Sequence, residues 1–161
     1  MTAHLPEDAH RRALLLALLG TALPLTGLAQ ERMPIEVWKD PQCGCCKDWV
    51  AHLETNGFGV KVNETGNNAA RARLGVQPRY GACHTAQVAG YAIEGHVPAA
   101  EIRRLLAQKP AAIGLAVPGM PIGSPGMDGA AYGGRKQAFD VLLLAGDGSA
   151  SVFAHYRGHA T

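Results

Sequence analysis

The chain has 161 residues, and 15 basic against 13 acidic side chains leave a formal net charge of +2. A chain of this length forms one domain with its own hydrophobic core and does not need disulfide bonds to fold. The basic residues are scattered and no face combines them with aromatic residues, so nucleic acid is not an expected partner.

The first 29 residues have the composition of an export signal. A basic segment that ends at Arg12 precedes the apolar run Ala13–Leu28, and small residues up to Ala29 suit a signal peptidase. The apolar run is short and is interrupted by glycine and proline, unlike a good membrane span. We therefore expect residues 1–29 to be a signal peptide and residues 30–161 to form an exported domain without stable membrane insertion.

The mature chain shows alternating strand and helix patterns. Apolar residues recur at helical spacing after the first strand, and β-branched residues alternate in the strands. The expected order is β-α-β-α-β-β-α, which is the order of thioredoxin and glutaredoxin. The predicted elements are a strand Ile35–Trp38, a helix Cys45–Asn56, a strand Phe58–Val62, a helix Ala69–Leu74, the strands Thr85–Val88 and Tyr91–Glu94, and a helix from Val97-Pro98 to Pro110.

Three of the four cysteines lie in the turn between the first strand and the first helix. At this position the helix dipole favours thiolate. In a thioredoxin-like arrangement the turn faces the loop before the third strand. We therefore expect Cys83 to lie beside Cys43, Cys45 and Cys46, although a long stretch of sequence separates them.

The C-terminal part does not follow the thioredoxin order. Gly114–Gly134 is a connection rich in proline and glycine that carries Met120 and Met127, and connections this long are usually functional or disordered. Phe139–Ala145 and Ser151–Tyr156 then predict a β-hairpin that extends the sheet. The expected fold class is α/β, a thioredoxin-like core with a Gly/Pro/Met-rich loop and a C-terminal hairpin.

Four converging thiolates bind soft metals such as Cu(I), Zn²⁺ or an iron–sulfur cluster. Zinc and iron–sulfur sites use separated pairs of ligands. Adjacent Cys45 and Cys46 cannot easily chelate one tetrahedral ion, but they can bridge several Cu(I) ions. The sequence also allows two other interpretations of the four cysteines. They could form a pair of ordinary disulfides, or Cys43 and Cys46 could be a dithiol that exchanges disulfides as thioredoxin does.

Two features disfavour a plain thiol–disulfide oxidoreductase. Thioredoxins have a cis-proline directly before the third strand, whereas this chain has Ala82 before Cys83 and its nearest proline there is Pro78. In addition, Cys45 inside the Cys43–Cys46 motif would compete as a resolving thiol. Both the missing proline and the extra thiol would be explained if this edge of the sheet binds metal.

Other soft or nitrogen ligands lie near these segments in the sequence. Met120 and Met127 are candidate thioether ligands, or parts of a lid that covers the edge of the sheet. His84 follows Cys83, but strand alternation points its side chain to the opposite face, which predicts a supporting role as readily as ligation. His96, in the loop before the third helix, is a weaker candidate.

Several motifs occur together in one order: Lys39–Cys46 with Trp49, Cys83–Ala86, Gly90-Tyr91, Glu94–Ala99, Gly114–Pro121 and Gly123–Met127. In these motifs the chain resembles a family of small periplasmic metal-binding proteins, long described only as a domain of unknown function, that includes the CopG-type copper-resistance proteins. The resemblance implies a thioredoxin-like fold and copper bound by Cys43, Cys45, Cys46 and Cys83. Ala82 stands where that pattern has serine, which changes a hydrogen bond to sulfur but removes no ligand.

The expected function is sequestration of Cu(I) in copper homeostasis or resistance, by a non-enzymatic protein with a multinuclear cluster. Copper redox cycling is a mechanistic extension of this function. The alternatives are a thiol–disulfide oxidoreductase of the thioredoxin type and a copper chaperone. Silver is a second candidate ion, because it is also soft and monovalent. Other periplasmic copper-handling proteins are the candidate partners.

Overall fold

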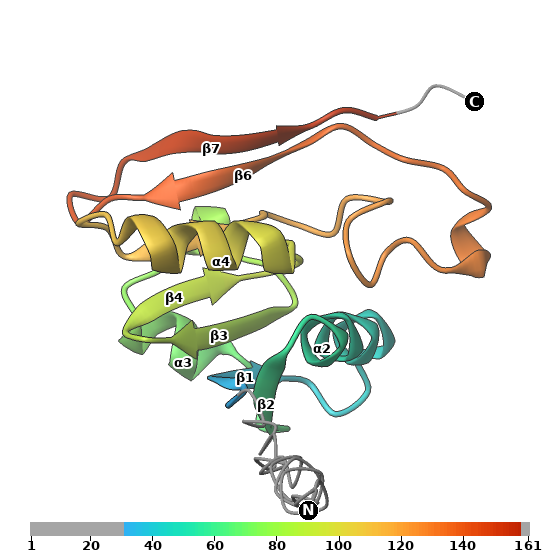
Figure 1. The fold of residues 1–161 in the computed structure, drawn as a ribbon, viewed down its shortest axis with the longest axis horizontal. Helices are drawn as coiled ribbons and strands as arrows, with labels where there is room; N and C mark the ends of the chain where they lie inside the picture. Colours follow the sequence, from blue (N-terminus) through green and yellow to red (C-terminus); the bar gives the residue numbers. More distant parts are fainter. Residues whose placement is uncertain (1–30, 159–161) are drawn as a thin grey trace, which may run out of the picture. The chain divides into compact units, whose positions relative to one another are not determined.

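The computed structural model describes residues 31–158, so the predicted signal peptide lies outside the described residues. Residues 31–158 contain one seven-stranded sheet and three α-helices (Figure 1). No helix in this part is long and apolar enough to cross a membrane. The elements are β1 (Met33–Lys39), α2 (Gly44–Thr55), β2 (Phe58–Asn63), α3 (Asn68–Arg73), η1 (Pro78–Tyr80), β3 (His84–Val88), β4 (Tyr91–Glu94), α4 (Ala99–Gln108), β5 (Gly114–Ala116), η2 (Ala130–Tyr132), β6 (Phe139–Leu144) and β7 (Ala150–Tyr156).

The strands lie in the order β2-β1-β3-β4-β5-β6-β7. β1 is parallel to β2 and β4 is parallel to β5, while the other neighbours are antiparallel. The predicted hairpin of β3 and β4 is confirmed, and its turn has φ angles of 46° at Ala89 and 88° at Gly90, as a two-residue hairpin turn requires. From β1 to α4 the elements follow the predicted order β-α-β-α-β-β-α.

One face of the sheet carries the larger core together with α2 and α4. Trp49 and Leu53 from α2, and Ile102 and Leu105 from α4, are buried against the strands. Of the predicted apolar stripe, which is Cys46, Trp49, Val50 and Leu53, three residues are buried and Val50 is partly buried against the core. The helix that carries the cysteines is therefore anchored by its buried side.

The opposite face carries α3 and a smaller core. Its buried residues are Val76, Ala92, Ala116 and Leu144. Thr85 and Glu94, paired across β3 and β4, have hydrogen bonds to side chains from the start of α3 and from α3 itself. Because side chains alternate along a strand, the neighbouring His84 lies on the α2 face, where its ring packs on Trp49. Polar residues on both faces thus flank the start of β3.

The segment Gly114–Gly134, predicted as a structureless connection, contains a strand. β5 has only three residues and pairs with β4 on one side and β6 on the other. A strand this short gives almost no periodic signal, because the two neighbouring strands stabilise it. The rest of the segment makes a long excursion, drawn in orange in Figure 1, before the chain returns as β6. The hairpin of β6 and β7 extends the sheet as predicted.

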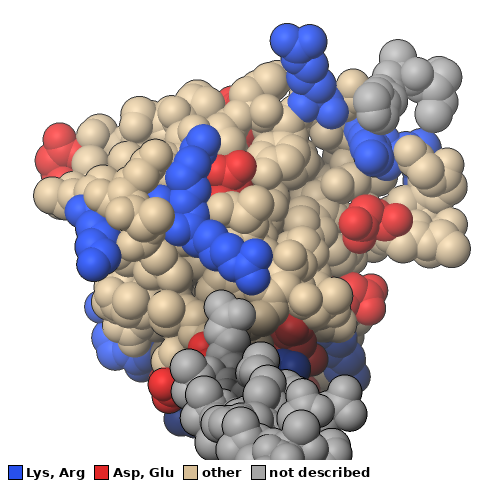
Figure 2. All heavy atoms as spheres, viewed as in Figure 1, with Lys and Arg blue, Asp and Glu red and all other residues tan. Residues whose placement is uncertain are grey.

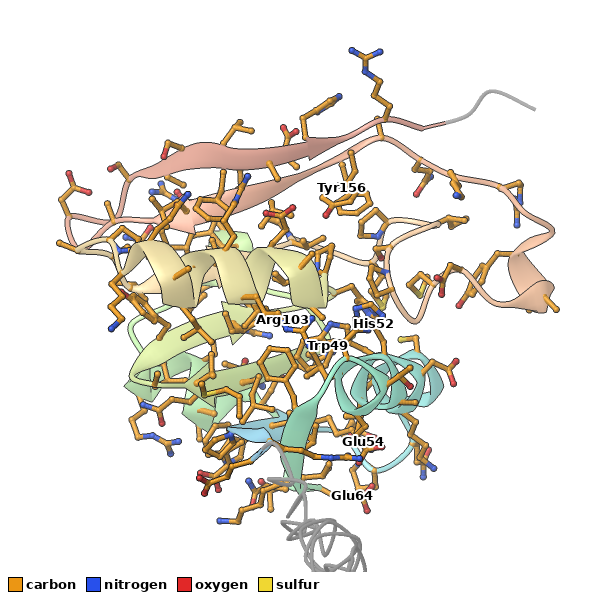
Figure 3. All side chains as sticks on the ribbon, in the orientation of Figure 1. Trp49, His52, Glu54, Glu64, Arg103 and Tyr156 are labelled. Carbon is orange, nitrogen blue, oxygen red and sulfur yellow. A yellow bond between two sulfur atoms is a disulfide. The ribbon has the colours of Figure 1, made fainter. Side chains whose placement is uncertain are left out.

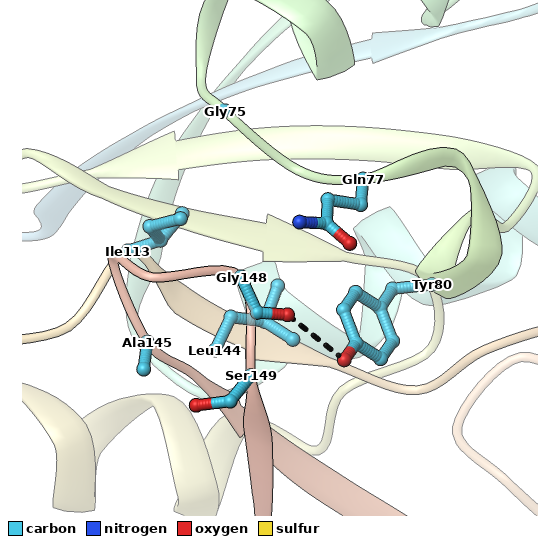
Figure 4. Close-up of a pocket in the computed structure, with 8 residues that line it drawn as sticks. All are labelled: Gly75, Gln77, Tyr80, Ile113, Leu144, Ala145, Gly148 and Ser149. Atoms are coloured by element: carbon cyan, nitrogen blue, oxygen red, sulfur yellow. Dashed lines mark hydrogen bonds between the residues drawn. The ribbon is translucent and has the colours of Figure 1, made fainter.

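The turn between β6 and β7 is tied to the segment after α3. Tyr80 donates its hydroxyl to Gly148 O at 3.2 Å, and Arg79 donates to the same oxygen at 2.6 Å (Figure 4). The cavity at this junction has a volume of about 10 Å³, enough for one water molecule at most. No cysteine lines it, and the two hydrogen bonds tie the β6–β7 turn to η1.

Charged side chains are dispersed over the face of the molecule that Figure 2 draws. On the face drawn in Figure 2, Lys and Arg side chains lie singly or in small groups among uncharged residues, with Asp and Glu between them. The ion pair Lys61–Glu36 joins β2 to β1, and the ion pair Arg104–Glu101 lies on α4. On the face drawn, charged side chains therefore do not gather into one patch of a single sign.

Candidate metal centre

The turn after β1 is held by its own backbone. Gln42 N–H donates to Asp40 Oδ1 at 2.8 Å, and Cys43 N–H donates to Asp40 O at 3.1 Å. Cys43 is the N-cap residue of α2, and Cys45 and Cys46 lie in the first turn of the helix. Short-range hydrogen bonds thus place three sulfur atoms at the positive end of the helix dipole.

The four cysteines come together as predicted. Cys43 and Cys46 form a disulfide, while Cys45 and Cys83 are free thiols. Cys45 Sγ lies 3.6 Å from Cys43 Sγ and 3.9 Å from Cys83 Sγ. All four sulfur atoms lie within 4.8 Å of one another. Reduction of the disulfide would leave four thiols in a space that suits one or more soft ions.

Pairing between β1 and β3 brings Cys83 to this turn. The antiparallel register sets Lys39, the last residue of β1, opposite His84, the first residue of β3. The residues that follow Lys39 and precede His84 therefore meet at one edge of the sheet. Strand pairing, a long-range feature, delivers the fourth sulfur atom.

Two histidines contact Cys83. His84 Nδ1 lies 3.4 Å from Cys83 Sγ, and His96 Nε2 lies 3.2 Å from it. The other ring nitrogens contact backbone carbonyls, His84 Nε2 at Gly95 O (2.9 Å) and His96 Nδ1 at Pro125 O (2.8 Å). Because a carbonyl only accepts, each of these nitrogens carries the proton and the nitrogen facing sulfur keeps a lone pair.

The expectation that strand alternation would turn His84 away from Cys83 was wrong. Cys83 lies just before β3, outside the regular strand, so the alternation does not apply between it and His84. The His84 ring lies between Trp49 and His96, with ring centroids 4.1 Å and 4.9 Å away. Both histidines are buried, which makes them part of the wall behind Cys83.

Burial sets the protonation of these groups. It lowers the pKa of His84 to about 3, with the neighbouring His96 acting in the same direction. It also lowers the pKa of His96, against the effect of the Pro125 carbonyl. Burial raises the pKa of the Cys83 thiol to about 12, and the neighbouring Cys45 adds to this. The imidazoles are thus neutral at pH 7, and Cys83 loses its proton readily only beside a cation.

The glycine-rich excursion covers the start of α2. A Cβ on Gly126 would lie 2.7 Å from Cys45 O and 2.8 Å from Trp49 N, so only glycine permits this approach. Met127 is buried, and its Sδ accepts a hydrogen bond from Tyr132 at 3.2 Å, whereas Met120 is 52% exposed. The two methionines, predicted as equivalent, therefore have different environments.

Trp49 and His52 join α2 to the start of α4 (Figure 3). Trp49 Nε1 donates to Val97 O at 2.9 Å, and Ala99 N–H donates to His52 Nε2 at 3.1 Å. His52 is half-buried, and its Nε2 serves as this acceptor. The cysteine helix is thus fastened to the segment that carries His96.

Comparison with known proteins identifies the family. A family model described as a protein of unknown function, DUF411, matches residues 80–127. A search of curated proteins gave no match. Form 1 and Form 2 of copper resistance protein CopG are solved structures with 47% and 48% sequence identity and TM-scores of 0.73 and 0.72. Their matches cover 80% and 78% of this chain and 100% and 99% of those chains. The chain belongs to the CopG family.

In this CopG family member the available ligands are all soft or borderline. Four sulfur atoms form one group, and Cys83, His84 and His96 form a second group whose ligand atoms also lie within 4.8 Å of one another. Cys83 belongs to both groups. Thiolate and imidazole suit copper better than they suit calcium or magnesium, which prefer oxygen.

Sequence reasoning missed a buried polar cluster next to Cys83 in this CopG family member. Glu94 is fully buried and contacts Arg71, Thr85 and the backbone of Ala82. The sequence held one signal, a glutamate at the end of the apolar strand Tyr91–Glu94. A charged residue at such a position is almost never buried unless it is paired.

Proposed function

We propose that this protein is a periplasmic copper-binding protein that sequesters Cu(I) through Cys43, Cys45, Cys46 and Cys83. The observation that carries the proposal is the group of four sulfur atoms within 4.8 Å, supplied by two segments far apart in the sequence. The solved relatives are named copper resistance proteins, which agrees with this choice of metal. The same proposal includes export directed by a signal peptide, residues 1–29, which is then removed. It also includes a thioredoxin-like fold for β1 to α4.

The arrangement favours a cluster of several Cu(I) ions over one tetrahedral ion. Cys45 and Cys46 are adjacent, so their sulfur atoms suit bridging between ions, and Cu(I) accepts two or three sulfur ligands. The Cys43–Cys46 disulfide has to be reduced before all four sulfurs can bind. His84 and His96 are further candidate ligands, because each directs a ring nitrogen at Cys83 Sγ. Met120 and Met127 are candidates for a lid or for transfer of the ion, and silver is expected to bind similarly.

An anaerobic titration of the reduced protein with Cu(I), in competition with a chelator, tests this proposal. Wild type is expected to hold more than one equivalent of Cu(I), and Cys83→Ser is expected to lose that capacity. Met33→Leu is a suitable control, because Met33 at the start of β1 is 43% exposed, is not a candidate ligand, and the change conserves side-chain volume. A reduced wild-type protein that gives up its Cu(I) to the competing chelator would contradict the proposal.

The disulfide supports a second candidate function, exchange of electrons between thiols and copper. Two thiolates, those of Cys43 and Cys46, would give one electron each to two Cu(II) ions, which yields two Cu(I) ions and the disulfide. The reverse step would give two Cu(II) ions and the two thiolates, which become the dithiol on uptake of two protons. Anaerobic addition of two equivalents of Cu(II) to the reduced protein should then produce two equivalents of chelatable Cu(I) and the Cys43–Cys46 disulfide, and Cu(II) that stays oxidised would exclude this function.

Two other functions make different predictions. A thiol–disulfide oxidoreductase would reduce insulin disulfides without copper, and Cys43→Ser would abolish that activity. A copper chaperone handing ions to other periplasmic proteins would keep its stoichiometry in the double variant Met120→Leu, Met127→Leu but transfer copper more slowly. These two tests therefore separate each of these functions from simple sequestration of Cu(I).

A further inference from the structure

The residue before Cys83 is held by side chains on both of its backbone polar groups. Ala82 N–H donates to Glu94 Oε1 at 2.7 Å. Ala82 O accepts from Arg71 Nη2 at 2.5 Å and from Asn67 Nδ2 at 3.2 Å. The peptide groups on both sides of Ala82 are therefore fixed by side chains from β4, from α3 and from the residue that precedes α3.

Glu94 lies at the centre of this arrangement. Its Oε1 also accepts from Arg71 Nε at 2.9 Å, and its Oε2 accepts from the Thr85 hydroxyl at 2.6 Å. Thr85 Oγ1 accepts in turn from Asn67 Nδ2 at 3.2 Å. Both carboxylate oxygens thus act only as acceptors, and each has a donor. Asn67, the N-cap residue of α3, makes no side-chain cap bond to this helix and donates to Ala82 O and Thr85 Oγ1 instead.

Such a cluster needs an explanation beyond stability. The Glu94 side chain is fully buried and that of Arg71 is 16% exposed. Removing an ion pair from water costs free energy, and a well-packed apolar pair is often at least as stable. A buried pair does, however, fix geometry, because its planar groups accept few alternative arrangements.

Backbone hydrogen bonds hold the preceding residue, since Gly81 N–H donates to Pro78 O at 3.0 Å and Gly81 O accepts from Gly119 N–H at 3.2 Å, whereas Ala82 is held by side chains. No proline precedes Cys83 directly, and residues 31–158 contain no cis peptide bond. Gly95 closes the other side of Ala82, where an added Cβ would lie 2.6 Å from Ala82 Cβ. Ala82 is thus confined between the Gly95 backbone and the Glu94–Arg71 pair.

We propose that Glu94, acting with Arg71, is a positioning residue that sets the place of Cys83 Sγ relative to Cys45 Sγ. The two sulfur atoms lie 3.9 Å apart and belong to different segments, so a shift of the Ala82–Cys83 peptide changes their separation directly. The consequence for copper rests on the function proposed above. Glu94 belongs to neither of the two groups of candidate ligand atoms.

Glu94→Gln tests the proposal with almost no change in shape. Glutamine has one acceptor oxygen and lacks the charge that pairs with Arg71, so the clamp on Ala82 is weakened. Loss of a group that orients a ligand typically lowers metal affinity about 10- to 100-fold, and we expect a loss of Cu(I) affinity in this range. Arg71→Lys, which cannot reproduce the planar fork, is expected to act in the same direction and serves if Glu94→Gln fails to fold.

Glu101→Gln is the matched control. Glu101 is also a mostly buried glutamate with an arginine partner, Arg104, and a hydroxyl donor, Tyr156, but it lies on α4 and does not contact Ala82. A purely structural effect of losing a glutamate charge would appear in this variant as well. We expect its Cu(I) affinity to equal that of wild type.

A metal-free measurement separates this proposal from the proposed function. With the Cys43–Cys46 disulfide intact, only Cys45 and Cys83 are free, and dibromobimane links thiols at such short separation. Trypsin cuts at Lys47 and Arg79, so the linked peptides identify the pair. Glu94→Gln and Arg71→Lys should lower the rate of Cys45–Cys83 linkage at least several-fold, while Glu101→Gln leaves it unchanged.

The outcomes are distinct. Wild type that fails to bind Cu(I), combined with slower linkage in both variants, would remove the proposed function and leave the positioning role supported. Folded Glu94→Gln and Arg71→Lys proteins that match Glu101→Gln in linkage rate would overturn the positioning role, whatever the copper titration shows.

Discussion

The two segments that supply the sulfur atoms are held in different ways. The turn of Cys43, Cys45 and Cys46 is stabilised by neighbours in the sequence, chiefly the carbonyl and carboxylate of Asp40. Cys83 is held by residues from both faces of the sheet, with His84 and His96 on one side and the Glu94 cluster behind Ala82 on the other. The difference teaches that the turn supplies ligands locally, whereas the geometry of the complete centre depends on tertiary packing around Cys83.

Glycine substitutions give the largest expected contrast between the two segments. Gly95 has a φ of +70°, and a Cβ there would lie 2.4 Å from Val117 O. Gly95→Ala should lower the free energy of unfolding by about 2–4 kcal/mol, from backbone strain and overpacking together. Gly44, in the cysteine turn, has no atom within 4 Å of an added Cβ, and Gly44→Ala at the start of α2 should be neutral or stabilise by up to about 1 kcal/mol.

Urea unfolding of both variants, with the disulfide intact, measures this contrast. The Cys45–Cys83 linkage rate should fall in Gly95→Ala and stay at the wild-type value in Gly44→Ala. Equal losses of stability in the two variants would show that the Cys83 side is no more tightly packed than the turn.

Trp49 is the main contact between the two segments, because it reaches from the cysteine helix to Val97 and His84. Trp49→Phe removes the donor to Val97 O, leaves a buried carbonyl unpaired and opens a small void. We expect the free energy of unfolding to fall by about 2 kcal/mol. Trp38→Phe is the control, because Trp38 is half-buried on the other face and makes only a cation–π contact with Arg73. Thermal unfolding at a lower temperature for Trp38→Phe than for Trp49→Phe would contradict the role assigned to Trp49.

The sequence predicted local features well and long-range ones less completely. The spacing of Cys46, Trp49 and Leu53 identified the buried side of α2, and the alternation of Val and Ile identified β1. Strand β5 escaped notice because pairing, not composition, forms it. The approach of Cys83 to the turn was predicted from the order of elements. The contacts of His84 and Glu94 were not, since they depend on where β3 begins and on which side chains of α3 face it.

A smaller effect should appear in the dependence of stability on pH. Burial lowers the pKa of His52, against the opposing effect of Asp128, and its neutral Nε2 accepts from Ala99 N–H. The unfolded chain has the higher pKa, about 6.5, so it binds the proton first as pH falls. The His52 contribution is therefore complete above about pH 6.5 and is lost as pH falls through the lower pKa of the folded state.

His52→Gln isolates this contribution, because glutamine keeps an acceptor and does not titrate. Between pH 8 and pH 5, the free energy of unfolding in urea should fall further in wild type than in His52→Gln. The remaining fall in the variant belongs to the other buried histidines and to the carboxylates. Identical pH profiles would mean that His52 keeps its ordinary pKa.

The smallest expected effect concerns the two methionines of the glycine-rich excursion. Met120 is 52% exposed, so Met120→Leu should change the free energy of unfolding by no more than about 0.5 kcal/mol. Met127 is buried and accepts the Tyr132 hydroxyl, so Met127→Leu leaves that donor without its sulfur partner and should cost about 1 kcal/mol. Because Met120→Leu should leave the stability of the fold almost unchanged, a slower transfer of Cu(I) from this variant to a chelator would not be caused by unfolding. It would show that Met120 takes part in the transfer. A transfer rate equal to wild type in this variant, at unchanged stoichiometry, would exclude Met120 as a transfer ligand.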